Sequence, residues 1–226
     1  TSFANYADTG GVQLPGQLTT KNDKYTVASI QVSKSTVNGD VGDLAAPAGV
    51  RAAAVPDAIA PANITVEEVS KGIWYLAGQS HHSVLVEFAD HVVLIETPQN
   101  EVRSAAVVAK AKELVPGKPI RYVINTHHHF DHSGGIRTAI AEGATIITHE
   151  GNKAFIEEVA NRPHTLSPDA LSRNPKPAVV ETVSDKRVLQ DATRTLEIHH
   201  MVGNAHSDTM LMIYFPLEHL IVEADV

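Results

Sequence analysis

The sequence contains no cysteine, which excludes disulfide bonds and thiolate metal ligands. It also has no apolar run long enough to cross a membrane as a helix. Basic residues are too few for a broad positive face, because 18 Lys and Arg are opposed by 26 Asp and Glu. The formal net charge of −8 therefore argues against a nucleic-acid-binding protein.

The residues that are present describe a globular protein, with 43% hydrophobic and 19% charged residues. A length of 226 residues suits one large domain, or one domain and a fragment of another. The chain begins at Thr1 and not at Met, which predicts a processed or cut N-terminus. Together with the lack of cysteine, this start favours an exported or periplasmic location.

Three parts follow one another along the chain. Residues 1–37 are rich in Thr, Val and Ile between turn residues, which predicts β-hairpins from the tail of a separate domain. Residues 38–63 are rich in Ala and Pro and read as a linker. Residues 64–226 form the main domain.

The main domain starts with several strands and then alternates helices with strands, which favours a layered α/β sandwich. Helices are expected over 101–114, 135–141 and 151–161. Strands are expected over 64–69, 73–77, 83–88, 92–96, 120–125, 144–148, 178–183, 187–189, 195–198, 210–214 and 220–223.

The strongest motif is His-x-His-x-Asp-His, formed by His127, His129, Asp131 and His132. It lies in a loop after a predicted buried strand, at the edge where α/β proteins place their chemistry. Imidazole and carboxylate together suit zinc, iron or manganese. Four such side chains in six residues cannot all bind one ion, but they can serve two adjacent ions. The alternatives are a histidine cluster on a polar loop or the remnant of a tag. The run is internal, interrupted by Phe130 and Asp131, and flanked by a strand and a helix start, which argues against a tag.

The motif resembles that of the metallo-β-lactamase superfamily, and the resemblance runs from about Ile64 to the end of the chain. It includes Gly203-Asn204-Ala205-His206-Ser207-Asp208, which is similar to the third histidine motif of the family. It also includes the strand Leu220–Glu223 and Asp225. The fold that this implies is a four-layer αβ/βα sandwich, here preceded by a β-rich fragment.

The resemblance implies a ligand set for two divalent metal ions, with zinc expected first and iron or manganese as alternatives. His127, His129 and His206 would hold one ion, Asp131 and His132 the other, and Asp225 would bridge them. In the family, the fold continues past this point and supplies a further histidine to the second ion. We therefore expect the C-terminal part of the fold to be missing here.

The chemistry that this implies is hydrolysis of a small-molecule substrate. A metal-bridging hydroxide would attack an ester, lactone, thioester or amide carbonyl, and Asp131 would act as the catalytic residue that orients it. A β-lactam-hydrolysing enzyme is one alternative. A metal-stabilised binding or structural module without turnover is another.

Other residues carry weaker predictions. His81 and His82 lie in a turn between two predicted strands, where they would contact substrate or simply form an exposed polar turn. Glu96 ends a strand where the family usually has an aspartate that supports the metal loop, so its role stays open. Asp225 has the alternative role of capping its strand.

Overall fold

The computed structural model of the protein describes residues 1–51, 62–78 and 80–225. Contacts divide the chain into two units, residues 1–59 and 60–226. Of the predicted linker, residues 52–61 lie outside the described residues. No helix in the described part of the chain is long and apolar enough to cross a membrane.

The first unit holds a small antiparallel sheet in the order β1-β2-β3. The β-hairpin segment predicted over residues 1–37 consists of strands β1 (Ser2–Thr9), β2 (Val12–Asn22) and β3 (Tyr25–Gln31). A short helix, α1 (Ala48–Arg51), was not predicted. The large side chains of this sheet are mostly exposed, as expected for strands that cannot bury a core by themselves.

The second unit is built on a seven-stranded sheet in the order β10-β9-β8-β7-β6-β5-β4. Strands β7 to β10 run parallel to their neighbours, and strands β4 to β7 form an antiparallel meander. The strands are β4 (Thr65–Ser70), β5 (Ile73–Ala77), β6 (Ser83–Glu87), β7 (Val92–Ile95), β8 (Ile120–Ile124), β9 (Thr145–His149) and β10 (Val179–Val183).

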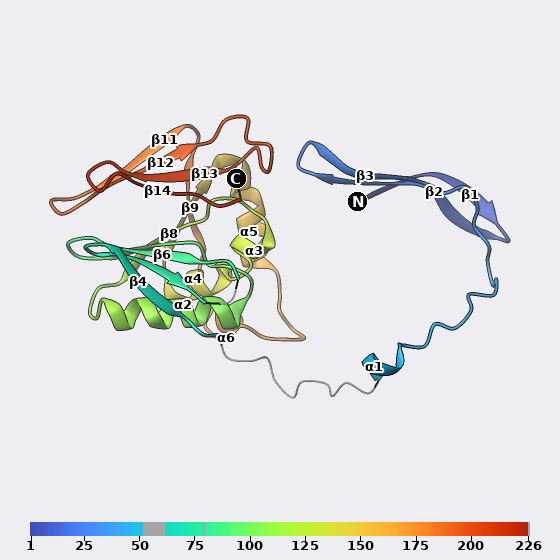
Figure 1. The fold of residues 1–226 in the computed structure, drawn as a ribbon, viewed down its shortest axis with the longest axis horizontal. Helices are drawn as coiled ribbons and strands as arrows, with labels where there is room; N and C mark the ends of the chain where they lie inside the picture. Colours follow the sequence, from blue (N-terminus) through green and yellow to red (C-terminus); the bar gives the residue numbers. More distant parts are fainter. Residues whose placement is uncertain (52–61, 79, 226) are drawn as a thin grey trace. The chain divides into compact units, whose positions relative to one another are not determined.

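Helices cover one face of this sheet (Figure 1). In α2 (Glu101–Leu114), Asn100 caps the N-terminus by accepting a hydrogen bond from the Arg103 N–H. Apolar side chains of the helices pack against Leu76, Leu94 and Ile146 of the sheet. The remaining elements are α3 (Phe130–Ser133), α4 (Ile136–Glu142), the 3₁₀ turn η1 (Glu150–Asn152), α5 (Lys153–Asn161) and α6 (Ala170–Arg173).

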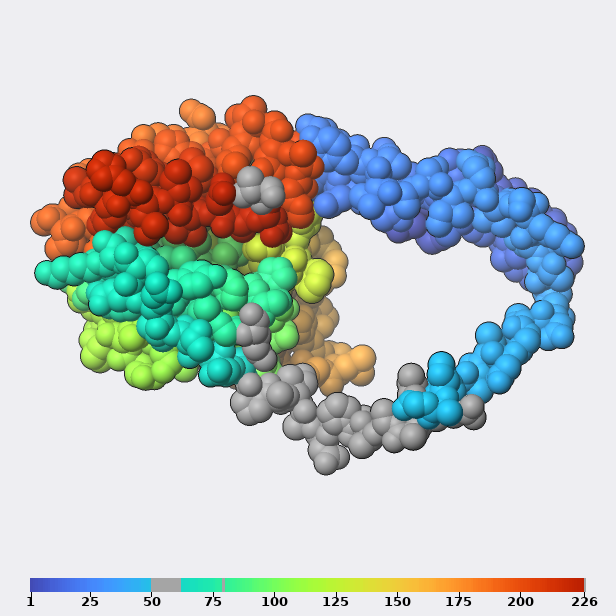
Figure 2. All heavy atoms as spheres, viewed as in Figure 1, coloured from blue at the N-terminus to red at the C-terminus, as the bar shows by residue number. Residues whose placement is uncertain are grey.

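A second, four-stranded antiparallel sheet packs on the other face, in the order β11-β12-β13-β14. Ile198 and Ile213 of this sheet and Val93 and Ile124 of the larger sheet belong to one buried apolar cluster. Figure 1 shows the two sheets stacked, and in Figure 2 the orange and red atoms of the C-terminal segment lie against the teal atoms of the larger sheet. The strands are β11 (Lys186–Gln190), β12 (Thr195–His200), β13 (Leu211–Phe215) and β14 (Leu220–Val222).

The order of elements therefore agrees with the predicted layered α/β sandwich. The described residues provide a helix layer and two facing sheets, and within them no helix lies on the outer face of the second sheet (Figure 1). The short helices α3 and α6 were not predicted separately, because one turn of helix leaves little periodicity in a sequence.

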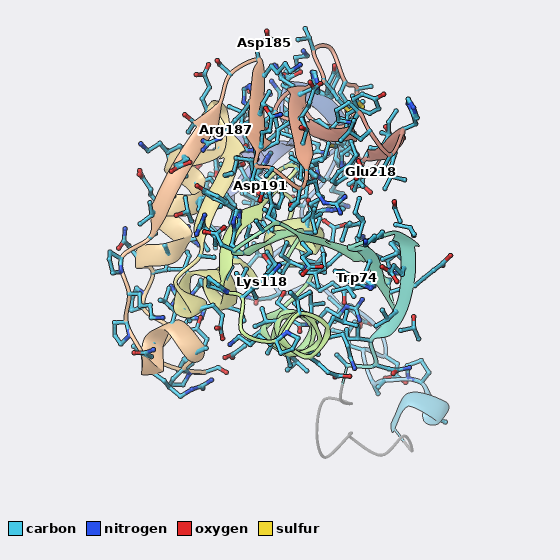
Figure 3. All side chains as sticks on the ribbon, turned by 90° about the vertical axis from the view of Figure 1, so that its left-hand side faces the viewer. Trp74, Lys118, Asp185, Arg187, Asp191 and Glu218 are labelled. Atoms are coloured by element: carbon cyan, nitrogen blue, oxygen red, sulfur yellow. The ribbon has the colours of Figure 1, made fainter. Side chains whose placement is uncertain are left out.

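Arg194 holds the two sheets together at the strand ends remote from the histidine motif. Its buried guanidinium donates to the carbonyl oxygens of Glu87 (3.0 Å) and Lys71 (2.6 Å) in the larger sheet, and it pairs with Glu218 of the smaller one. Asp191 adds a second link by accepting a hydrogen bond from the Ala89 N–H (2.6 Å). Asp191 and Glu218 are labelled in Figure 3.

We predict that Arg194→Met lowers the free energy of unfolding by about 2 kcal/mol, because two carbonyl oxygens and Glu218 lose their donor. Urea denaturation measures the change. Arg162→Met is the control, since Arg162 pairs with Glu158 on the exposed surface and such pairs contribute about 0.5 kcal/mol or less. Equal effects of the two substitutions would contradict the role given to Arg194.

Candidate metal centre

The histidine motif follows β8 and lies at one edge of the sandwich. The backbone leaves the sheet at Asn125 and buries Thr126 and His127 completely. The parallel neighbour β7 ends at the same edge and places Glu96 there. The second sheet contributes two candidate ligands. The loop between β12 and β13 carries His206, and the segment after β14 carries Asp225.

Three imidazoles converge in the first ligand group. His129 Nδ1 lies 3.0 Å from His127 Nε2 and 2.8 Å from His206 Nε2. The other nitrogen of His127, Nδ1, contacts the hydroxyl of Thr126 at 3.1 Å, so Nε2 is the atom turned toward the cluster. The His206 loop is held by Asn204, whose side chain accepts hydrogen bonds from the backbone N–H of His206 and of the next residue.

Asp131 and His132, the second half of the motif, lie beside a histidine from outside it. His81 Nε2 is 3.0 Å from Asp131 Oδ2, and His132 Nε2 is 4.0 Å from the same oxygen. One donor atom of each of these three residues lies within 4.8 Å of the others. The motif therefore divides between two adjacent groups of donors, as the spacing predicted.

A single oxygen of Asp225 lies between the two groups. Asp225 Oδ2 is 2.9 Å from Nε2 of His132, 3.2 Å from Nε2 of His206 and 3.5 Å from Nε2 of His127. The first of these histidines belongs to the second group and the other two belong to the first group. The structure thus places the Asp225 carboxylate among histidines of both groups.

The donor atoms fit divalent metal ions. Two ligand atoms on a tetrahedral zinc ion with ordinary bond lengths lie about 3.3 Å apart, and the separations above cluster around that value. The buried Nε2 of His132 makes no hydrogen bond of good geometry among the described residues, although two carboxylate oxygens lie within 4.0 Å of it. Imidazole and carboxylate donors in such an arrangement are typical of zinc sites.

The surroundings of His127 and His132 shift the pKa values of the two rings in opposite directions. Burial, followed by repulsion from the neighbouring histidines, lowers the pKa of His127 to about 2, so its ring stays neutral and keeps a lone pair for a metal. Burial acts in the same direction on His132, but the carboxylates of Glu96, Asp225 and Asp131 outweigh it and raise the pKa of His132.

Glu96 contacts the motif loop, although its side chain is one carbon longer than the aspartate that the family usually has at this position. Its Oε1 accepts a hydrogen bond from the Thr126 N–H at 2.8 Å, and its Oε2 faces His132 Nδ1 at 3.4 Å. A carboxylate on the second ring nitrogen of a ligand histidine fixes the ring and increases its basicity. The left-handed backbone of Glu96 (φ 69°) turns the carboxylate toward the loop.

Close packing explains the glycines after the motif. A Cβ on Gly134 would lie 2.0 Å from the carbonyl oxygen of Gln99, and one on Gly135 would lie 1.8 Å from Ser104 Oγ. Only glycine lets the motif helix approach the start of α2 this closely. Left-handed backbone at the non-glycine residues His81, Glu96, Gln99 and Asp225 adds strain of the kind that is common at functional sites.

A pocket of about 280 Å³ opens beside the second group. Both histidines of the predicted substrate-contacting turn line it, but they differ in their contacts. His81 joins the donor cluster, whereas His82 packs its ring against Tyr75 with the ring centroids 5.1 Å apart. Burial, followed by the charges of Arg103 and His81, lowers the pKa of His82.

Three residues that hold the His81 turn were not predicted from the sequence: Ser80, Gln99 and Arg103. Their contacts join segments distant in sequence, and their residue types are common, so no local pattern reveals them. The signal that the sequence did offer is the polar Gln-Ser-His-His turn at a strand end, where binding residues are frequent.

Comparisons with known proteins agree with the geometry. The sequence profile described as "Metallo-beta-lactamase superfamily" matches residues 76–225. The chain belongs to the metallo-beta-lactamase superfamily, as its motifs predicted. Members of this family are generally metal-dependent hydrolases of small molecules, and the fold typically binds divalent metal ions, usually zinc.

Solved structures show the same fold. A metallo-beta-lactamase from Pontibacter korlensis is 18% identical, with a TM-score of 0.52 over 69% of this chain and 68% of the other. A metallo-beta-lactamase from Hirschia baltica is 21% identical, with a TM-score of 0.51 over 72% of this chain and 70% of the other. No curated protein matches the sequence significantly.

We predict that Glu96→Gln weakens zinc binding about 10- to 100-fold, because the carboxylate facing His132 becomes an amide. Isothermal titration of the zinc-free protein with zinc measures the change. Glu87→Gln is the matched control, since Glu87 lies on the same sheet and pairs with Lys118 instead of a histidine. Unchanged zinc affinity in the Glu96 variant would refute the supporting role.

Proposed function

We propose that the protein is a dinuclear metal-dependent hydrolase that attacks an ester, lactone, thioester or amide carbonyl. The observation that carries this proposal is the position of Asp225, whose one oxygen lies within 3.5 Å of ring nitrogens in both donor groups. A purely structural metal site needs one closed set of ligands. Two adjacent sets that share a carboxylate beside an open pocket suit catalysis better.

Each candidate site residue has a separate role in this proposal. His127, His129 and His206 would hold the first ion, and Asp131 and His132 would hold the second, with Asp225 shared. When bound, divalent ions lower the pKa of a water molecule and polarise a carbonyl oxygen. Asp131 brings a carboxylate that can accept a hydrogen bond from water and orient it toward the pocket.

The pocket favours a small substrate with both apolar and polar parts. Tyr75, Val84 and Val222 line it together with His82 and Ser83. Such a mixture, apolar walls with a few polar groups, is typical of small-molecule sites. The volume, about 280 Å³, is at the lower end of the usual range for ligand pockets, roughly 300 to 1,000 Å³.

β-Lactam hydrolysis is a second candidate. The solved structures with this fold carry the name metallo-beta-lactamase. A β-lactam contains an amide carbonyl and is therefore within the reaction class proposed here. A substrate panel for this protein should contain a chromogenic cephalosporin beside aryl esters, lactones and thioesters.

We predict that Asp131→Asn lowers kcat/KM on the best substrate of this panel at least 100-fold, because the amide orients water poorly and is a weak ligand. The unfolding temperature should change little. Glu113→Gln removes a carboxylate from the exposed face of α2 and should leave turnover unchanged.

Chelation completes the test. A strong chelator should abolish turnover, and added zinc should restore it. Hydrolysis that persists in the chelator would refute the metal mechanism. If the zinc-loaded protein hydrolyses nothing in the panel and Asp131→Asn fails to fold, the metal instead stabilises a binding or structural module.

A further inference from the structure

His81 lies outside the histidine motif, in the turn between β5 and β6, yet it reaches the second donor group. We propose that His81 is a direct ligand of the second metal ion, together with Asp131 and His132. This inference rests on the dinuclear site proposed above and assigns His81 a role at the metal instead of at the substrate.

The geometry of the donor atoms supports ligation. His81 Nε2 lies 3.0 Å from Asp131 Oδ2, a separation close to the roughly 3.3 Å between ligand atoms on tetrahedral zinc. The His81 ring meets the His132 ring edge-on, with the ring centroids 5.2 Å apart. His132 belongs to the same group of donors, and its Nε2 lies 4.0 Å from Asp131 Oδ2.

The other nitrogen of His81 faces a hydroxyl that can accept a hydrogen bond from its N–H. His81 Nδ1 lies 2.7 Å from the hydroxyl of Ser80 and 3.4 Å from the side-chain nitrogen of Gln99. The same nitrogen of Gln99 donates to the Ser80 hydroxyl at 2.8 Å. With Nδ1 held in this way, the ring presents Nε2 to Asp131 and His132.

Arg103, a fully buried residue of α2, holds the backbone of His81 by a hydrogen bond. Its guanidinium donates to the carbonyl oxygens of His81 (3.3 Å), Ala77 (3.2 Å) and Asn63 (3.1 Å). His81 itself adopts left-handed backbone, with φ 58°. A histidine at this strained position would be costly to retain in an ordinary polar turn, whereas a ligand requires one orientation.

A plain ion pair between His81 and Asp131 is the competing explanation, and metal stoichiometry separates the two. The experiment measures zinc bound per chain by elemental analysis, and zinc affinity by isothermal titration. The proteins are the wild type, His81→Ala, His81→Asp and His82→Ala. His82→Ala is the matched control, because His82 occupies the same turn but belongs to none of the donor groups found among the described residues.

We expect two zinc ions per chain in the wild type and in His82→Ala. His81→Ala should keep one ion tightly and bind the second at least tenfold more weakly. His81→Asp should recover much of that loss, because aspartate is also a zinc ligand. Thermal unfolding of the zinc-free proteins checks that each variant folds. If His81→Ala does not fold, the zinc content of His81→Asp still tests the proposal.

Different failures identify different errors. If His81→Ala binds two ions with unchanged affinity, His81 is not a ligand, and the dinuclear hydrolase still stands. If the second ion is lost but wild-type protein hydrolyses no substrate in the panel, the hydrolase proposal fails and the role of His81 stands. A wild type that binds a single ion overturns both.

Discussion

The candidate metal centre depends on the packing of two sheets against each other. Motif residues come from the end of β8 in the larger sheet, whereas His206 and Asp225 come from the smaller one. A shift of even 1 Å between the sheets would separate the Asp225 oxygen from the ring nitrogens it now faces. The buried apolar cluster between the sheets, together with the hydrogen bonds of Arg194 at its far end, holds the donor residues in position.

Bringing several imidazoles within about 3 Å of one another is possible only if most of them are uncharged. Burial supplies this condition for His127, whose lowered pKa keeps the ring neutral over the whole physiological range. At His132 the carboxylates of Glu96, Asp225 and Asp131 outweigh burial and raise the pKa. The surroundings therefore shift the pKa values of these two histidines in opposite directions.

Much of this could be predicted from the sequence. Hydrophobic periodicity located the helices and strands of residues 64–226, and the spacing of His127, His129, Asp131 and His132 predicted two groups of donors. His81 was predicted as a substrate contact, but its approach to Asp131 could not be predicted, because it depends on a turn brought to the motif by the pairing of β5 and β6 and by the side chain of Arg103. Likewise, the length of the Glu96 side chain alone did not reveal that its left-handed backbone compensates for it.

Arg103 has a further consequence. One guanidinium binds both the carbonyl oxygen of Asn63, where the chain enters the second unit, and that of His81. The entry segment and the histidine turn thus share a rigid mechanical anchor within α2. A displacement of the chain at Asn63 would therefore reach the His81 turn through Arg103 as well as through the pairing of β4 with β5.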